Sequence, residues 1–340
     1  MAAFEEIERR RRRAKSSYKD AKKHFVRLDG WLPVFRAYAR QKARAVHYLT
    51  LCAKDAIDVR YFRIKGVLEY DAKQKAYPTV SFIERDPQDY AVIAESLGTT
   101  KLGIRGDLEA ILVRPDENPN NSAKLRRSFP YDIINLDLTG EVVREGDPPY
   151  SQTIRAIEKI IELQHGANCP SWHMFLTFRA CPETANHEAD QELRGIIEAN
   201  LQNAQAREAY GNRLAPEELL GAQYEEFLRI GIIKFLASSA SHRGYTCSLE
   251  NSYVYAREPR DGGPHYHIVK LIVRFGVFRL AGHLPNPHNV MAIYQESVPA
   301  IFQSQPIDVV ARLQANDIRE RILEDLRPVL DELTAQRIVE

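Results

Sequence analysis

Short apolar runs alternate with helical stretches from residue 47 to residue 180, and this alternation limits the folds open to the chain. The runs are HYLTLCA (47–53), TVSFIE (79–84), KLGIRGD (101–107), YDIINLD (131–137) and SWHMFLTFRA (171–180). Strands separated by helices form parallel sheets, because each crossover helix returns the chain to the same edge. The sequence therefore predicts an α/β fold with a doubly wound, mostly parallel sheet.

The segments around these strands carry helix and turn signals. Asp86 and Pro87 begin a predicted helix over 86–97, which ends at Gly98. The turn EPRDGGP separates 245–257 from 265–277, which predicts a C-terminal antiparallel hairpin. The Pro- and Asn-rich segment 114–128 is typical of a surface loop. Further helices are predicted over 108–113, 151–166, 187–209, 215–237 and, as one or two helices, 305–337.

The first 45 residues differ from the rest in charge. They hold 14 Lys and Arg against 5 Asp and Glu, although the whole chain has a net charge of +1. We expect a basic helical arm over 1–45, in which Gly30 and Pro33 separate two helices. A Rossmann-like domain over 46–280 and a C-terminal helical extension over 281–340 would follow. The basic run of the arm suits either phosphate contacts or docking to a partner protein: Arg9, Arg10, Arg11, Arg12 and Arg13.

The composition argues against several classes of protein. No apolar run approaches the roughly 18 residues of a membrane span, so no membrane association is expected. The N-terminus lacks the apolar core of a signal peptide. Four cysteines are scattered without a CxxC pair, which disfavours zinc clusters and disulfide frameworks and indicates the cytoplasm.

Polar residues gather at the ends of the predicted strands. In a doubly wound sheet, ligands bind outside the carboxyl ends of the strands, at the point where the strand order reverses. Acidic side chains fall at four successive ends, which packing alone does not explain. The candidates are Asp55 and Asp58 after the first strand, Glu84 after the second, Asp107 after the third, and Asn135, Asp137 and Gly140 at the fourth.

From residue 46 to 277 this order of motifs resembles the class I S-adenosylmethionine-dependent methyltransferases. The resemblance implies that Glu84 in SFIERDPQDYAVIAESL binds the ribose hydroxyls and that Asp107 in GIRGD lies by the adenine. NLDLTG (135–140) is similar to the motif beside the transferring methyl group, which implies catalytic roles for Asn135 and Asp137 and a cofactor contact for Gly140. The most similar subgroups are the tRNA guanine dimethyltransferases and the three-Cys-motif partner proteins found near phage-defence genes.

The first loop departs from this family. The family's loop is rich in glycine so that the backbone approaches the cofactor closely, whereas CAKDAIDVRYF has no glycine. Asp55 or Asp58 would then bind the methionine amino group. Three functions stay open: a methyltransferase acting on nucleic acid, an inactive methyltransferase-like subunit of a multi-protein defence complex, and a Mg-dependent nuclease or phosphotransferase. No protein-bound metal is indicated for the first two.

Overall fold

The structure is a computed structural model of the 340-residue chain. It describes residues 20–41, 44–138, 140–142, 151–184, 223–257, 264–278, 303–314 and 318–339, together with the isolated positions 195, 198, 208, 300 and 301. The predicted helix over 187–209 and the turn EPRDGGP lie almost entirely outside the described residues.

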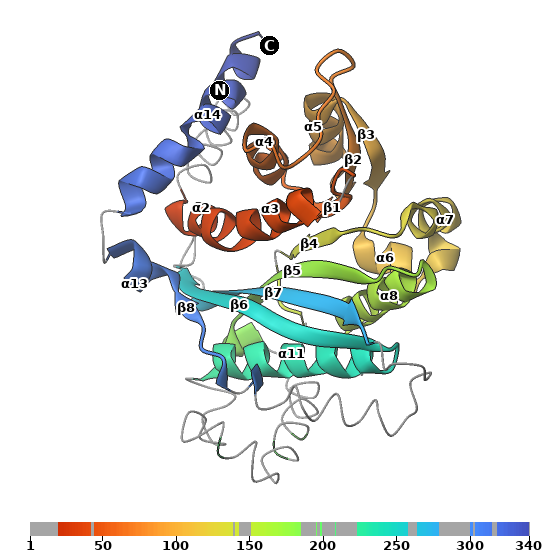
Figure 1. The fold of residues 1–340 in the computed structure, drawn as a ribbon, viewed down its shortest axis with the longest axis vertical. Coiled ribbons are helices and arrows are strands. Elements are labelled where there is room, and N and C mark those ends of the chain that lie inside the picture. The colour runs from red at the N-terminus through yellow and green to blue at the C-terminus, as the bar shows by residue number, and fades with distance from the viewer. Residues whose placement is uncertain are drawn as a thin grey trace.

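One sheet of eight strands forms the centre of the molecule, with the order β3-β2-β1-β4-β5-β7-β6-β8 (Figure 1). The strands β1 to β5 pair in parallel, and β7 is antiparallel to both β5 and β6. The predicted fold class and the C-terminal hairpin are therefore confirmed. The strands are β1 (Tyr48–Leu51), β2 (Ala76–Glu84), β3 (Thr99–Arg105), β4 (Ile133–Asp137), β5 (Ser171–Ala180), β6 (Tyr245–Arg257), β7 (Tyr266–Val277) and β8 (Ile307–Asp308).

Helices cover both faces of this sheet and bury two apolar cores (Figure 1). One face carries α2 (Ala21–Val26), η1 (Arg27–Trp31), α3 (Leu32–Gln41), α4 (Ile57–Ile64), α5 (Pro87–Leu97), α13 (Val309–Gln314) and α14 (Ile318–Val339). The other carries α6 (Leu108–Val113), α7 (Pro119–Ser128), α8 (Gln152–Gly166) and α11 (Tyr224–Ser241). Two short 3₁₀ turns, η2 (Pro115–Glu117) and η3 (Pro182–Thr184), complete the described elements.

The predicted break at Gly30 and Pro33 is wrong. The helix continues through η1, a π-helical turn in which the Leu32 N–H bonds the carbonyl of Arg27 five residues back. Pro33 lies two residues beyond this wider turn and has no N–H to donate. The helix continues past it without the missing hydrogen bond. Gly30 serves close packing instead, because a Cβ there would lie 2.6 Å from Ile272 Cδ1.

The predicted loop over 114–128 is also wrong in its second half, which forms α7. Pro119 occupies the first turn of this helix, where its missing N–H costs nothing. Ser122 and Leu125 are buried. The Pro and Asn content therefore reflects the start of the helix rather than an irregular loop.

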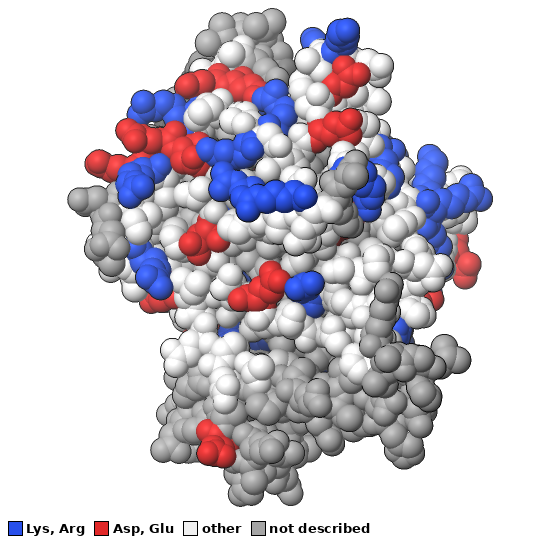
Figure 2. All heavy atoms as spheres, viewed as in Figure 1, with Lys and Arg blue, Asp and Glu red and all other residues white. Residues whose placement is uncertain are grey.

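Residues 20–41 of the predicted arm pack against the sheet, and Trp31 and Phe35 are almost completely buried. The run from Arg9 to Arg13 lies outside the described residues. No described helix is long and apolar enough to span a membrane. On the face in Figure 2, acidic and basic side chains are interspersed in the upper part, where Figure 1 places α14 and α4.

Candidate functional site

The carboxyl ends of β3, β2, β1 and β4 follow one another along a single edge of the sheet. β1 lies between β2 and β4, so the strand order reverses beside it. The predicted residues of all four strand ends are therefore carried to one edge, as the topology of a doubly wound sheet requires. Their side chains form two groups, one around the end of β1 and one at the end of β4.

The loop after β1 makes a sharp turn without glycine. Ala56 adopts the left-handed conformation, with φ 44° and ψ 39°, and is fully buried. This conformation costs an ordinary residue roughly 1–2 kcal/mol. The Ala56 N–H donates to the Ala53 carbonyl at 2.7 Å, and α4 begins directly afterwards. The backbone thus takes a shape that usually calls for glycine.

Asp58 points into the sheet and organises a buried polar network. Its Oδ2 accepts hydrogen bonds from the Tyr48 hydroxyl at 2.6 Å and the Thr50 hydroxyl at 3.0 Å. Asn135 on β4 joins the network through Nδ2, 3.1 Å from the Tyr48 oxygen and 3.4 Å from Asp58 Oδ2. The Asn135 Oδ1 is buried with no hydrogen-bond partner among the described residues. The structure therefore joins two predicted site residues, beneath the strand ends.

The charges of Asp58, Glu84 and Asp55 all act on the thiol of Cys52. Burial, together with these carboxylates, raises the pKa of Cys52 well above its usual range. Glu84 is partly exposed, and its Oε1 accepts from the Asp86 N–H at 2.7 Å. Partial burial raises the pKa of Glu84. Because the carboxylate is partly exposed, a ligand can reach it from solvent.

Asp107 lies next to Glu84, since the Gly106 N–H donates to the Glu84 carbonyl at 2.9 Å. Asp107 caps α6 through the Ala110 N–H at 3.1 Å. A hydrogen bond to the neighbouring Glu109 helps to lower the pKa of Asp107, while burial and the same bond raise the pKa of Glu109. Glu109, which the sequence did not single out, is largely buried and accepts from Thr153 at 2.8 Å.

Asp137, at the end of β4, lies among cations. Lys270 Nζ is 3.6 Å from its Oδ1, and Lys23 Nζ is 3.9 Å from its Oδ2. Burial opposes ionisation, but the charges of Lys270, Lys23 and Arg27 outweigh it and hold the pKa of Asp137 well below its usual range. Asp137 is therefore a carboxylate at neutral pH and a weak base.

Lys270 is the most unusual member of this group. It lies on β7 directly opposite Thr177 of β5, donates to that hydroxyl at 3.0 Å, and is only 2% exposed. Burial lowers its pKa to about 8. The sequence contains a signal for this position. In HIVKLIV, Lys270 lies two residues from both Ile268 and Ile272, so on a strand it shares their face and points into the core.

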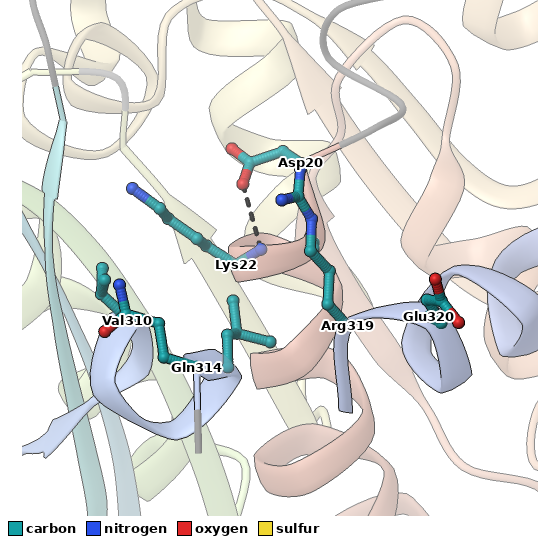
Figure 3. Close-up of a pocket in the computed structure, with 8 residues that line it drawn as sticks. Asp20, Lys22, Val310, Gln314, Arg319 and Glu320 are labelled. Atoms are coloured by element: carbon teal, nitrogen blue, oxygen red, sulfur yellow. Dashed lines mark hydrogen bonds between the residues drawn. The ribbon is translucent and has the colours of Figure 1, made fainter. Parts of the chain in front are cut away.

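Gly140 lies three residues beyond Asp137, and its carbonyl accepts from the Arg179 N–H at 3.1 Å. A cavity of about 510 Å³ lies on the other flank of α2, between the start of α2 and α13–α14 (Figure 3). Lys22 lines this cavity, whereas its neighbour Lys23 pairs with Asp137. Within the described residues, no group of three or more His, Cys, Asp or Glu is placed to hold a metal ion.

A family model described as PP_RS20740-like matches residues 104–315, more than half of the chain. The chain belongs to the PP_RS20740-like family. The matched segment begins within β3 and includes Asp107, Asp137 and Lys270. No curated protein matches the chain.

Among solved structures, the chain is similar to TYW2 of M. jannaschii in complex with AdoMet, with 12% identity, a TM-score of 0.31, and coverage of 73% of this chain and 76% of that one. It is also similar to an rRNA methylase from Streptococcus thermophilus, with 11% identity, a TM-score of 0.31, and coverage of 73% of this chain and 96% of that one. A third similar structure is the plantazolicin methyltransferase BamL in complex with a triazolic desmethylPZN analog and SAH. It has 10% identity, a TM-score of 0.32, and coverage of 76% of this chain and 98% of that one.

Proposed function

We propose that the protein is an S-adenosylmethionine-dependent methyltransferase that acts on nucleic acid. The observation that carries the proposal is the row of acidic side chains along the carboxyl ends of β1 to β4, at the reversal of the strand order. It divides into a group around Cys52 and a group around Asp137. Two adjacent groups suit two ligands, a cofactor and a methyl acceptor.

The first group suits the nucleoside part of the cofactor. Glu84 has a partly exposed carboxylate that ribose hydroxyls could reach, and Asp107 lies beside it on the next strand end. The methionine amino group would bind Asp55, because Asp58 Oδ2 already accepts hydrogen bonds from Tyr48 and Thr50. Ala56 adopts the left-handed conformation, so the loop makes its sharp turn between β1 and α4 without a glycine. Gly140 would add a backbone contact. The bound cofactor supplies an electrophilic methyl group.

Asp137 would orient the acceptor. Its pKa is held low by neighbouring cations, so it accepts a hydrogen bond from the reacting amine and removes a proton only weakly. Most of the rate enhancement assigned to the protein is therefore positioning of the nucleophile. Asn135 lies beneath Asp137 and would act through the network that it shares with Tyr48 and Asp58. The basic run from Arg9 to Arg13 would bind the phosphate backbone.

An inactive, methyltransferase-like subunit of a multi-protein complex, for example in phage defence, is the second candidate. The glycine-free loop favours it, because glycine is the residue that lets backbone approach a ligand most closely. A protein of this kind would keep the fold and the strand-end acids without binding the cofactor. A cofactor titration therefore separates the two candidates.

The test is calorimetric titration of the purified chain with S-adenosylmethionine. We expect saturable binding that is weakened about tenfold or more in Glu84→Gln, which loses a charged hydrogen-bond acceptor. Glu95→Gln removes the same charge from an exposed position of α5 and should bind as the wild type does. Absence of binding to the folded wild type would rule out the methyltransferase and leave the inactive subunit.

A further inference from the structure

One side of α2–η1 faces the end of β4 with side chains spaced four residues apart. Lys23 approaches Asp137, and the charge of Arg27 acts on both Asp137 and Lys270. Trp31 follows, with Lys270 Nζ 5.0 Å from the centre of its ring. The three side chains therefore converge on the position where the proposed function places the acceptor.

These side chains offer hydrogen-bond donors that lack acceptors. Three buried donor groups have no hydrogen-bond partner among the described residues: Arg27 Nε, Trp31 Nε1 and the Tyr255 hydroxyl. Trp31 and Tyr255 are each only 2% exposed. Leaving a buried donor unpaired costs roughly 1–3 kcal/mol. The charges of Asp137 and Arg27 also act on Tyr255. Three such donors, beside the partly exposed Lys23, indicate a ligand rich in acceptor atoms.

The charges at this position do not balance. The charges of Lys270, Lys23 and Arg27 all act on Asp137. In the described part of the chain Asp137 is the only carboxylate in an ion pair with Lys23 or Lys270, and Arg27 forms no ion pair. Lys23 and Arg27 are partly exposed, so a ligand can reach both from solvent. The surplus of positive charge therefore favours an anionic ligand.

The backbone holds these donors in place. η1 is a π-helical turn, a feature that occurs often at functional sites. Gly30 lets η1 press onto the sheet, since a Cβ there would lie 2.8 Å from the Tyr253 hydroxyl. The Trp31 ring stacks on Phe175 at 5.2 Å between centroids, with an interplanar angle of 3°. The donors are thus presented by a fixed surface.

We propose that Lys23, Arg27, Trp31 and Tyr255 form a subsite beside Asp137 that binds a phosphate group of the methyl acceptor. This inference rests on the proposed function for the identity of the ligand as acceptor. A phosphate offers several charged acceptor oxygens, and it bonds strongly to guanidinium and ammonium donors. The neighbouring Asp137 is left to orient the group that receives the methyl.

Trp31 provides a direct readout. In a Trp172→Phe background it is the remaining tryptophan, because the chain has two. Titration with inorganic phosphate against chloride at constant ionic strength should change its fluorescence in a saturable way. Arg27→Gln and Lys23→Gln should each weaken this binding about tenfold. Arg40→Gln is the matched control, since Arg40 is exposed on α3, and it should bind as the parent does.

The competitor identifies the source of the phosphate. Displacement by a short single-stranded RNA supports a polynucleotide, and displacement by adenosine monophosphate alone supports a mononucleotide. The subsite is refuted if the folded parent shows no saturable response, or if Arg27→Gln and Arg40→Gln respond alike. S-adenosylmethionine binding without phosphate binding overturns the subsite alone, whereas phosphate binding without S-adenosylmethionine binding overturns the methyltransferase proposal.

Discussion

Arg60 donates from Nε to the backbone carbonyl of Asp55 at 3.2 Å, which ties helix α4 to the glycine-free loop after β1. The guanidinium is 1% exposed and also pairs with Glu332 of α14 at 2.5 Å. Through Arg60, the C-terminal helix therefore contacts the loop that would hold the cofactor. One helical face of α14 makes this contact, because Asp325, seven residues earlier, bonds Tyr61 at 2.7 Å.

Glu332→Gln should destabilise the fold by about 3 kcal/mol, since it leaves the buried Arg60 without its carboxylate. It should also loosen the loop, so that the buried Cys52 reacts faster with a thiol reagent. Asp325→Asn is the control on the same helix face, because it pairs with Tyr61 and Lys65 but not with Arg60. If both variants change the rate at Cys52 equally, Arg60 does not link α14 to the loop.

Ala56→Gly should raise the free energy of unfolding by up to about 1 kcal/mol. Glycine removes the left-handed strain of roughly 1–2 kcal/mol, but it adds entropy to the unfolded chain. Urea unfolding measures the change. Ala53→Gly, at an exposed position of the same loop with no positive φ, should lower stability instead. A loss of stability in Ala56→Gly would contradict the strain at this residue.

Lys270 should make stability depend on alkaline pH. Its pKa is lowered from 10.5 to about 8, so between these values the unfolded chain binds more protons than the folded one. Stability therefore rises with pH across this window. From pH 8 to 9.5 the stability of the wild type should rise by about 1–2 kcal/mol relative to Lys270→Met. An unchanged difference between the two unfolding curves would mean that the pKa of Lys270 is not lowered by burial.

Asp137 should contribute stability that acid removes. Its folded pKa lies below the ordinary 3.8, because Lys270, Lys23 and Arg27 favour the carboxylate. The contribution is therefore complete above about pH 5 and declines as the pH falls through the folded pKa. The stability difference between wild type and Asp137→Asn should shrink below pH 4 in acid unfolding experiments. A difference that stays constant down to pH 2 would show that Asp137 is not held by these cations.

The strand and helix positions could be predicted because they depend on local patterns. The apolar runs, the Asp86–Pro87 cap and the helix end at Gly98 act over a few residues. α7 and η1 escaped prediction, since Pro and Gly there serve a helix start and a close approach to Ile272. These roles depend on neighbours that are distant in sequence.

By itself, the sequence determined the alternation of strands and helices, and with it the edge where Glu84, Asp107 and Asp137 lie. Only the tertiary structure decided what surrounds them. Lys270 follows Asp137 by more than a hundred residues, and Lys23 precedes it by a similar distance, yet both lie within 4 Å of its carboxylate. Local patterns determine the backbone, whereas the pKa of a side chain depends on charges that only folding brings close.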